Sequence, residues 1–481
     1  MLEPLPVVRL MATISQQIDC VQQLEVTVSR LRFTSEQAER KQTERRIEVS
    51  LTCVSALDLE AIGHVLVKLH DVQSVSMALP TFYAFPWVSV DRGLQLPHLR
   101  TLSLKGARAA CAATALINGG VALEKIHISD SDVDVVPWAF DIVERHPCIT
   151  EIIQTHCSLE MRRSPDVAPT VLNNETQDRA CKKVCLTQGL SSSDMIRLLS
   201  MCPRLETLQI CLLSFDIMAK PFHGVGPVGA HLKELTLDLH RYGAPIEPTT
   251  AILCSALKPR VGCQCGLIVL DLRFTASGRG QGAAVSSMLE QCPLLKELSL
   301  GLDLDIAAAD ALVIGLPTMP SLLCVKIHPA NSMPRCGAID RSTTVQFSSE
   351  RARVACTFLK KCVSIQDLDS DSLLAEQIPS GASLQNLKLN LSGATWLEDL
   401  CIIFERCLVL VSLDIKGDLR IDVATLEAFR RKLRSGLRVP QRFQELRLPN
   451  SLGHAYRWIE CLKQVLPSVK VVDGILADLR I

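Results

Sequence analysis

The sequence predicts an α/β solenoid, with a curved parallel sheet on its concave face and helices on its convex face. Three observations lead to this prediction. A six-residue apolar motif recurs along the 481-residue chain, helix-forming segments separate its copies, and apolar residues make up 48% of the chain while aromatic residues make up only 4%. A core of aliphatic side chains suits thin layers that repeat. We therefore expect a single solenoid over residues 1–481.

The motif has apolar residues at its first, fourth and sixth positions, as in Leu-x-x-Leu-x-Leu, and its copies begin roughly 25 residues apart. Clean copies begin at Leu99, Leu123, Leu205, Leu232, Leu267, Leu295, Leu322, Leu384, Leu410 and Phe443. Weaker copies begin at Val21, Val72, Ile149, Cys181, Ile365 and Val469. Because apolar and polar residues alternate within a copy, each copy predicts a half-buried strand.

Helices are expected between the strands. The segment 191–203, SSSDMIRLLSMCP, begins with residues that cap helices and then spaces its apolar residues along one helical face. Four similar segments lie at 283–293, 307–317, 395–407 and 422–436. Most of these segments end just before the next copy of the motif, so strand and helix alternate along the chain.

The junction between helix and strand also recurs. The segments 201-MCPRLETLQI-210 and 291-QCPLLKELSL-300 are almost the same, and 146-HPCITEI-152 is a looser version. Cysteines stand three residues before the first strand position at Cys202, Cys292, Cys362 and Cys407. A proline after the helix stops it, and we expect the small thiol to pack under the turn.

The period, the motif and the cysteine junction together resemble the leucine-rich repeat family over roughly residues 15–478. The junction resembles the ribonuclease-inhibitor-like and cysteine-containing subclass, as found in F-box proteins. The asparagine that usually follows the strand in this family is absent from almost every copy. The resemblance implies a solenoid that binds other proteins.

Two stretches interrupt the period, and we expect irregular insertions near 157–178 and 329–361. Insertions in repeat proteins emerge on one face and often take part in binding. A tolerated surface loop is the simpler interpretation of each.

No motif for catalysis, a cofactor or a metal is complete. The glycines of 224-GVGPVG-229 precede a strand, whereas a phosphate-binding loop must open a helix, so they predict a turn. The cluster 278-GRGQG-282 is interpreted as a loop between strand and helix. Cys254, Cys263 and Cys265 do not form the four-ligand set of structural zinc. We expect no enzyme activity, no cofactor and no metal.

Charge and hydropathy exclude two classes of partner, nucleic acid and membranes. Lys plus Arg number 51, as do Asp plus Glu, so no overall field attracts nucleic acid or a membrane surface. No apolar run is long enough for a transmembrane helix, and the first residues lack the basic start of a secretory signal. We expect a cytoplasmic protein, with a nuclear location as the second option, that binds neither nucleic acid nor membrane.

The binding face is expected where strand residues alternate with the buried motif positions. These outward residues are polar and of both charge signs, which suits recognition of a protein. The candidate partner-binding residues are Lys125, His127, Gln209, Glu234, Asp238, Asp271, Arg273, Lys326, His328, Asn386, Lys388, Asp414, Lys416 and Arg447.

The sequence therefore predicts a non-catalytic scaffold that binds a protein through its concave face and edge loops. One alternative is a substrate-recognition subunit of an F-box-type ubiquitin ligase, with ligase subunits as partners. Against it, residues 4–15 are short for an F-box, and the chain is expected to begin inside a repeat. A GTPase activator built on the same solenoid is a further alternative.

Overall fold

The computed structural model divides the chain into two compact units, Met1–Cys211 and Leu212–Ile481. We call them unit 1 and unit 2 and describe each by itself. The single solenoid over residues 1–481 stays a prediction. The structure describes residues 23–30, 45–52, 72–78, 99–106, 109, 113, 117, 123–131, 135–157, 179–190, 192–212, 231–239, 266–276, 278–330, 341–391, 395–417, 419, 423–449 and 455–473.

Unit 1 is built on a sheet of strands in chain order. Its described strands are β1 (Gln23–Arg30), β2 (Arg45–Thr52), β3 (Val72–Ala78), β4 (Thr101–Lys105), β5 (Lys125–Ser131), β6 (Glu151–Cys157), β7 (Lys183–Leu190) and β8 (Thr207–Leu212). Each strand from β2 to β6 pairs in parallel with the next. Helices α4 (Val135–Arg145) and α5 (Ser192–Met201) follow β5 and β7.

The start of unit 1 differs from the expected parallel sheet, because β1 pairs with β2 antiparallel. No copy of the motif marks β2, and we did not expect this strand. Its sequence still alternates, with Ile47, Val49 and Leu51 separated by polar residues, which is the pattern that predicts a strand. The search for six-residue copies missed it because the first motif position, three residues before Val49, is the charged residue Arg46.

Unit 2 alternates strands and helices, as expected. Its described strands are β9 (Glu234–Asp238), β10 (Val269–Ala276), β11 (Glu297–Leu304), β12 (Cys324–His328), β13 (Asp367–Ser370), β14 (Asn386–Asn390), β15 (Ser412–Lys416), β16 (Glu445–Leu448) and β17 (Lys470–Asp473). Its described helices are α7 (Arg279–Glu290), α8 (Ile306–Gly315), α9 (Arg341–Lys361), the 3-10 helix η1 (Ala375–Gln377), α10 (Trp396–Arg406), α11 (Val423–Arg434) and α12 (Ala455–Val465).

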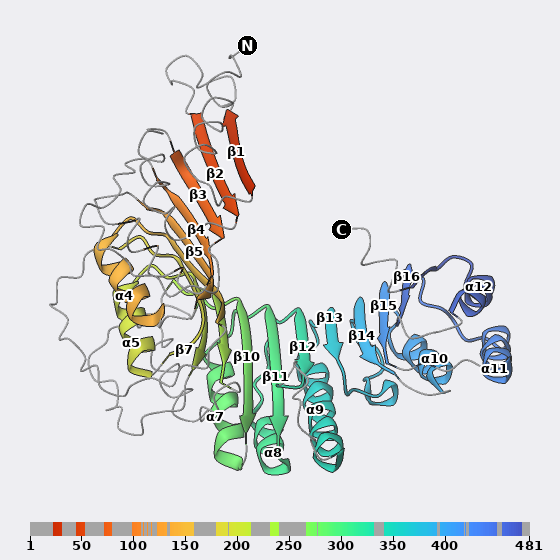
Figure 1. Cartoon of the computed structure of the whole chain (residues 1–481). Helices are drawn as coiled ribbons and strands as arrows, with labels where there is room; N and C mark the ends of the chain where they lie inside the picture. Colours follow the sequence, from red (N-terminus) through yellow and green to blue (C-terminus); the bar gives the residue numbers. More distant parts are fainter. Residues whose placement is uncertain are drawn as a thin grey trace, which may run out of the picture. The chain divides into compact units, whose positions relative to one another are not determined.

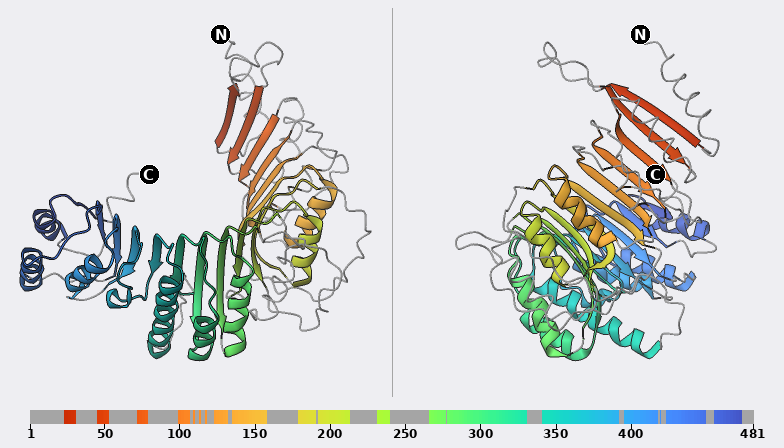
Figure 2. Two further views of the ribbon diagram at one scale, coloured as in Figure 1. Left: turned by 180° about the vertical axis from the view of Figure 1, so that it is seen from behind. Right: turned by 60° about the vertical axis from the view of Figure 1, so that its left-hand side comes forward.

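The strands of unit 2 form one parallel series, in which each strand from β9 to β16 pairs with the next along the chain. Helices α7, α8 and α9 stand side by side along one side of β10–β12 (Figures 1 and 2). An α/β repeat with a parallel sheet therefore matches the coarse fold class that the sequence predicts.

The core lies under the motif positions. In the copy that forms β11, Leu295, Leu298 and Leu300 are each at most 1% exposed, and the same positions are buried along the clean copies. Because side chains alternate across a strand, the residues between these positions face the other side of the sheet. Burial thus confirms which strand residues point outward, and those residues build the candidate site.

The cysteine junction is a buried turn, as expected. The carbonyl of Cys202 accepts a hydrogen bond from the amide of Leu205 at 3.1 Å, and Cys292, Cys362 and Cys407 accept equivalent bonds three residues on. All four cysteines are at most 2% exposed. Burial raises the pKa of the Cys407 thiol to about 12, so this thiol stays protonated and serves as a small apolar group.

One version of the junction differs from the others. In 146-HPCITEI-152 the residue at the buried turn position is His146, whose carbonyl accepts from Ile149 at 3.0 Å. His146 is 9% exposed, whereas Cys148 is exposed. Cys148 stands one residue before the first strand position, whereas Cys202 and its equivalents stand three residues before it. The backbone turn, and not the presence of a cysteine, therefore defines this position.

The stretch near 329–361 is largely a helix and not an irregular insertion, since α9 occupies 341–361. Val354, Ala355 and Phe358 are buried at helical spacing. Arg351, also buried, forms ion pairs with Asp303 at 3.3 Å and Asp371 at 3.5 Å. The polar composition hid this helix from the sequence analysis. Residues 158–178 and 331–340 lie outside the described residues.

The glycine cluster 278–282 was expected as a loop between strand and helix, but only Gly278 precedes the helix. Gly278 is the N-cap of α7, and Gly280 and Gly282 lie in the first turns of that helix. The amide of Gly278 donates to Asp305 Oδ2 at 2.9 Å, and the other oxygen of that carboxylate accepts from the Ala308 amide at 2.7 Å. A side chain at Gly282 would overlap the carbonyl oxygen of Ala308. These glycines therefore allow α7 and α8 to pack closely. The motif 224–229 lies outside the described residues.

Candidate functional site

Charged side chains line up across the sheet of unit 2 because its parallel strands are in register. Lys326 on β12 pairs with Asp369 on β13, and the same row continues through Lys388 on β14, Asp414 on β15 and Arg447 on β16. We call these five residues the charge ladder, and the sheet face that carries them the open face. The sign of charge alternates at every strand, and neighbouring strands lie about 4.8 Å apart.

The centre of the charge ladder is internally paired. The ammonium of Lys388 lies 3.0 Å from Asp414 Oδ2, and the ammonium of Lys416 lies 3.4 Å from Asp369 Oδ1. Partial burial acts to lower the pKa of Lys388, but the ion pair with Asp414 and the charge of Asp369 outweigh it and raise the pKa. Each of these side chains is about one third exposed or more. Such pairs contribute under about 1 kcal/mol each and exchange partners readily.

The two ends of the charge ladder are cations that face solvent. Lys326 is exposed, and among the described residues no carboxylate forms an ion pair with it. Arg447 is half exposed and pairs with Glu445 of its own strand, with Nε 2.7 Å from Oε1. The exposed Lys326 can therefore accept an anionic group from a partner without breaking the central pairs.

A second row runs beside the charge ladder and carries hydrogen-bonding groups. The side-chain amide of Asn386 donates to Asp367 Oδ1, and the hydroxyl of Ser412 donates to Asn386 Oδ1 at 2.7 Å. Asp367, Asn386 and Ser412 are in register on β13, β14 and β15. We call them the amide row. Their mutual bonds orient the Asn386 amide, so this row presents fixed polar groups.

A hollow of about 360 Å³ lies over these two rows. Its lining consists of the charge ladder and the amide row, together with Cys324, Glu445 and the motif leucines Leu368, Leu387 and Leu413. It is open to solvent along the sheet. Both charge signs are present in the lining, and the shape suits side chains that enter from a second macromolecule.

The hollow also has a thiol in its lining, and the surroundings of that thiol favour its protonated form. Cys324 is the thiol that lines it. Burial raises the pKa of Cys324, the neighbouring acids raise it further, and Lys326 only partly opposes them. A protonated thiol is a weak nucleophile. The described residues also contain no group of three or more His, Cys, Asp and Glu that could hold a metal ion.

A smaller polar group lies on β10–β12. Arg273 and His328 flank Gly301 in register, and the Arg273 side chain fills the space that a side chain at Gly301 would take. Asp271 forms an ion pair with Arg273 at 3.5 Å. Burial lowers the pKa of His328 despite the nearby charge of Asp271, so its imidazole is neutral at pH 7. This group extends the open face without adding a reactive residue.

Unit 1 carries its own polar row. Glu151 on β6 pairs with Lys125 of β5 at 3.1 Å and with Lys183 of β7 at 3.0 Å. His127 Nε2 lies 3.1 Å from the hydroxyl of Thr155, and burial lowers the pKa of this histidine. The predicted residue Gln209 is exposed on β8.

The candidate residues therefore fall into separate groups. Five of them line the hollow of unit 2: Lys326, Asn386, Lys388, Asp414 and Arg447. Lys416 joins them through Asp369. The others in unit 2 lie outside the lining of that hollow: Glu234, Asp238, Asp271, Arg273 and His328. Lys125, His127 and Gln209 belong to unit 1.

The sequence analysis missed Asp367 and Asp369. They belong to the weak copy that begins at Ile365, in which Ser370 replaces the last apolar residue. Ser370 is nevertheless fully buried, so β13 keeps the register of its neighbours. The alternation Asp367, Leu368, Asp369 was the signal that could have placed both carboxylates on the open face.

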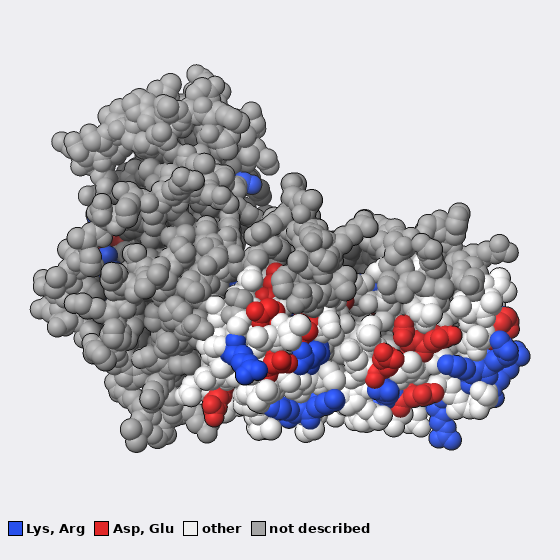
Figure 3. Space-filling view, turned by 90° about the horizontal axis from the view of Figure 1, so that it is seen from below, with Lys and Arg blue, Asp and Glu red and all other residues white. Residues whose placement is uncertain are grey.

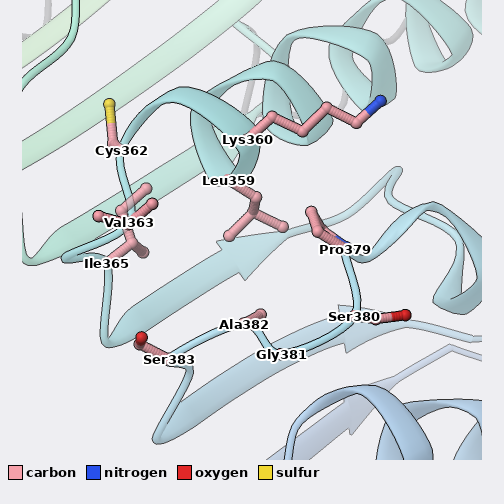
Figure 4. A pocket seen from close by; sticks show the side chains of 10 residues that line it. All are labelled: Leu359, Lys360, Cys362, Val363, Ile365, Pro379, Ser380, Gly381, Ala382 and Ser383. Atoms are coloured by element: carbon pink, nitrogen blue, oxygen red, sulfur yellow. The ribbon is translucent and has the colours of Figure 1, made fainter.

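A second hollow, of about 240 Å³, lies between the end of α9 and the loop before β14 (Figure 4). Leu359 points into it, while the amino group of Lys360 points away along the helix (Figure 4). Its other lining residues are Cys362, Val363, Ile365, Pro379, Ser380, Gly381, Ala382 and Ser383. The lining holds no pair of groups suited to acid and base catalysis.

A surface that binds nucleic acid would show a wide area of positive charge. On the face of unit 2 in Figure 3, the described acidic and basic side chains are instead interspersed. Within the part of the chain that the structure describes, no helix is long and apolar enough to cross a membrane.

No family model matches the chain, and no curated protein matches it.

Proposed function

We propose that this chain is a non-catalytic scaffold of leucine-rich repeat type that binds a protein partner through the open face of unit 2. The observation that carries the proposal is the charge ladder from Lys326 to Arg447, which five strands hold in register beside a polar hollow. Complementary charges set specificity and orientation at protein interfaces more than raw affinity.

A protein fits this face better than other macromolecules do. Nucleic acid requires cations that neutralise several phosphates, but Asp369 and Asp414 already separate the three cations of the charge ladder. An acidic membrane surface would meet the same carboxylates. A protein surface can place both signs of charge at defined positions, so it can match an alternating row.

The test is affinity purification of the full chain from its native cells, followed by mass spectrometry. The variant reverses charge at three ladder positions, Lys326→Glu, Lys388→Glu and Asp414→Lys. The control exchanges an ion pair outside the ladder, Glu460→Lys with Lys463→Glu on α12, where the wild-type side chains lie 2.8 Å apart. We expect a partner that the wild type and the control retain and the ladder variant loses.

An identical partner set for all three baits would overturn the assignment of this face. Cullin-type ligase subunits retained with every bait would favour the F-box-type alternative, with the partner lost from the ladder variant as the substrate. A partner set without ligase subunits would favour a plain scaffold.

A further inference from the structure

The spacing of the charge ladder specifies the kind of segment that binds it. We propose that the partner presents an α-helix that lies across the strands β12–β16, with acidic and basic residues alternating on successive turns of one face. This inference rests on the proposed function and adds the secondary structure, length and charge order of the bound segment.

The ladder has two repeats that a ligand must match. Opposite charges recur at every strand, about 4.8 Å, and like charges at every second strand, about 10 Å. One face of an α-helix offers side chains every turn, about 5.4 Å, and every second turn, about 11 Å. A helix therefore follows both repeats with a mismatch of about 0.6 Å per strand, which adds up to about 2.4 Å over the four spacings of the row.

Two other conformations of a single segment do not match both repeats. One face of an extended strand offers side chains about 6.7 Å apart, so opposite charges would lose register within three strands of the ladder. A polyproline II helix repeats about every 9.3 Å, which matches the like charges but leaves no side chain for the opposite charge between them.

The length of the ladder gives the length of the helix. From Lys326 to Arg447 the row crosses four strand spacings, or about 19 Å. An α-helix covers that distance in about 13 residues. The open hollow extends along the same strands, so side chains from the helix can enter it over the full row.

The sign order gives the sequence of the helix face. Acidic residues would face Lys326, Lys388 and Arg447, and basic residues would face Asp369 and Asp414. A slip by one turn would place like charges opposite each other along the whole row, so only alternate registers are allowed. The central cations and anions already pair with each other, so binding the helix adds little affinity at these positions. Its charges instead select how the helix is aligned along the row.

The test uses two synthetic 18-residue helices and the full chain. The alternating peptide carries Glu, Lys, Glu, Lys, Glu on successive turns of one face in an alanine background. The blocked peptide has the same composition, with its three Glu residues on consecutive turns. Both are cross-linked on the opposite face to hold them helical. Fluorescence anisotropy at low salt measures binding, and we expect the alternating peptide to bind about tenfold more tightly.

A reordered ladder provides the matched protein variant. Lys388→Asp with Asp414→Lys keeps one acid and one base on β14 and β15 but changes the row to Lys, Asp, Asp, Lys, Arg. This variant should lose the preference for the alternating peptide. The Glu460→Lys, Lys463→Glu control on α12 should keep it, since its ion pair is outside the ladder.

Equal binding of the two peptides by the wild-type chain, no binding of either, or a preference that survives in the reordered variant would overturn the helix inference. The proposed function is judged separately. If the native partner is lost from the three-position ladder variant while the peptides show no preference, the scaffold proposal stands and the helical ligand falls. If the partner is retained by that variant, the proposed function fails.

Discussion

The polar rows of the two units share one backbone geometry and differ in how their charges are used. In unit 1, Glu151 lies between Lys125 and Lys183 and pairs with both, at 3.1 and 3.0 Å, and its side chain is only 19% exposed. In unit 2, the charge ladder places five alternating charges in one row and leaves the cation of Lys326 without an ion pair among the described residues.

Under the proposed function, this difference separates a row that stabilises the fold from a row that contacts a partner. A carboxylate shared by two neighbouring lysines has its hydrogen-bonding capacity used within the sheet. A row with solvent-facing cations at both ends retains groups for a second molecule. Strands in register therefore do not make a binding face by themselves. We expect the role of a polar row to depend on the order of its charges and on how many of them are already paired within the sheet.

The largest expected effect concerns the close packing of helix α7 against helix α8 in unit 2. Gly282→Ala would place a side chain against the Ala308 carbonyl where α7 meets α8. Backbone atoms cannot yield cheaply, so we expect unit 2 to lose about 3 kcal/mol of unfolding free energy, measured by chemical denaturation. Gly280→Ala, at an exposed site in the same helix, should be neutral or stabilising. Equal effects of the two substitutions would contradict the packing role of Gly282.

A smaller effect tests the shared carboxylate of unit 1. Burial acts to raise the pKa of Glu151, but its bonds to Lys183 and Lys125 outweigh burial and lower the pKa below its ordinary value. Its contribution is therefore present above about pH 4.3 and is lost as the pH falls through the folded-state pKa. We expect Glu151→Gln to cost about 1 kcal/mol at pH 7 and to flatten the acid dependence of stability.

The control for that experiment is Glu124→Gln. Within the described part of the chain, Glu124 forms one ion pair, with Arg100 at 3.2 Å, and its side chain is 43% exposed. We expect this substitution to cost less than about 0.5 kcal/mol. If thermal unfolding between pH 3 and pH 7 showed the same dependence for both variants, Glu151 would have no special place in unit 1.

The smallest effect tests the charge ladder in the absence of a partner. The pKa of Lys388 is raised, so its contribution to stability is present below its unfolded value and is lost as the pH rises through the folded value. Because the side chain is partly exposed, we expect Lys388→Met to cost less than about 0.5 kcal/mol at pH 7. The difference from wild type should shrink as the pH rises above the ordinary pKa of lysine, about 10.4, and through the raised folded-state value.

Denaturation at pH 7 and pH 11 measures this difference. A cost of several kcal/mol at pH 7 would show that the ladder stabilises the fold in the way that Glu151 does in unit 1, and it would weaken the contrast between the two rows.

Much of the candidate site follows from the sequence because alternation determines which strand residues face outward. Lys326, Lys388, Asp414 and Arg447 were all placed by counting from the buried leucines. Asp367 and Asp369 were not, because their copy ends in Ser370 and its apolar pattern is weak. The helix α9 was missed for a similar reason, since its charged residues include the buried Arg351, whose carboxylate partners lie on other elements.

The sequence by itself determined most of the local structure of this protein: most of the strands, most of the helices, the buried motif positions and the cysteine turns. Local propensity and apolar period act over a few residues, so a single chain segment displays them. The tertiary structure alone decided which charges meet. Asp369 lies beside Lys388 and within reach of Lys416 because parallel pairing brings distant segments into register, and the number of residues between strands does not reveal that register.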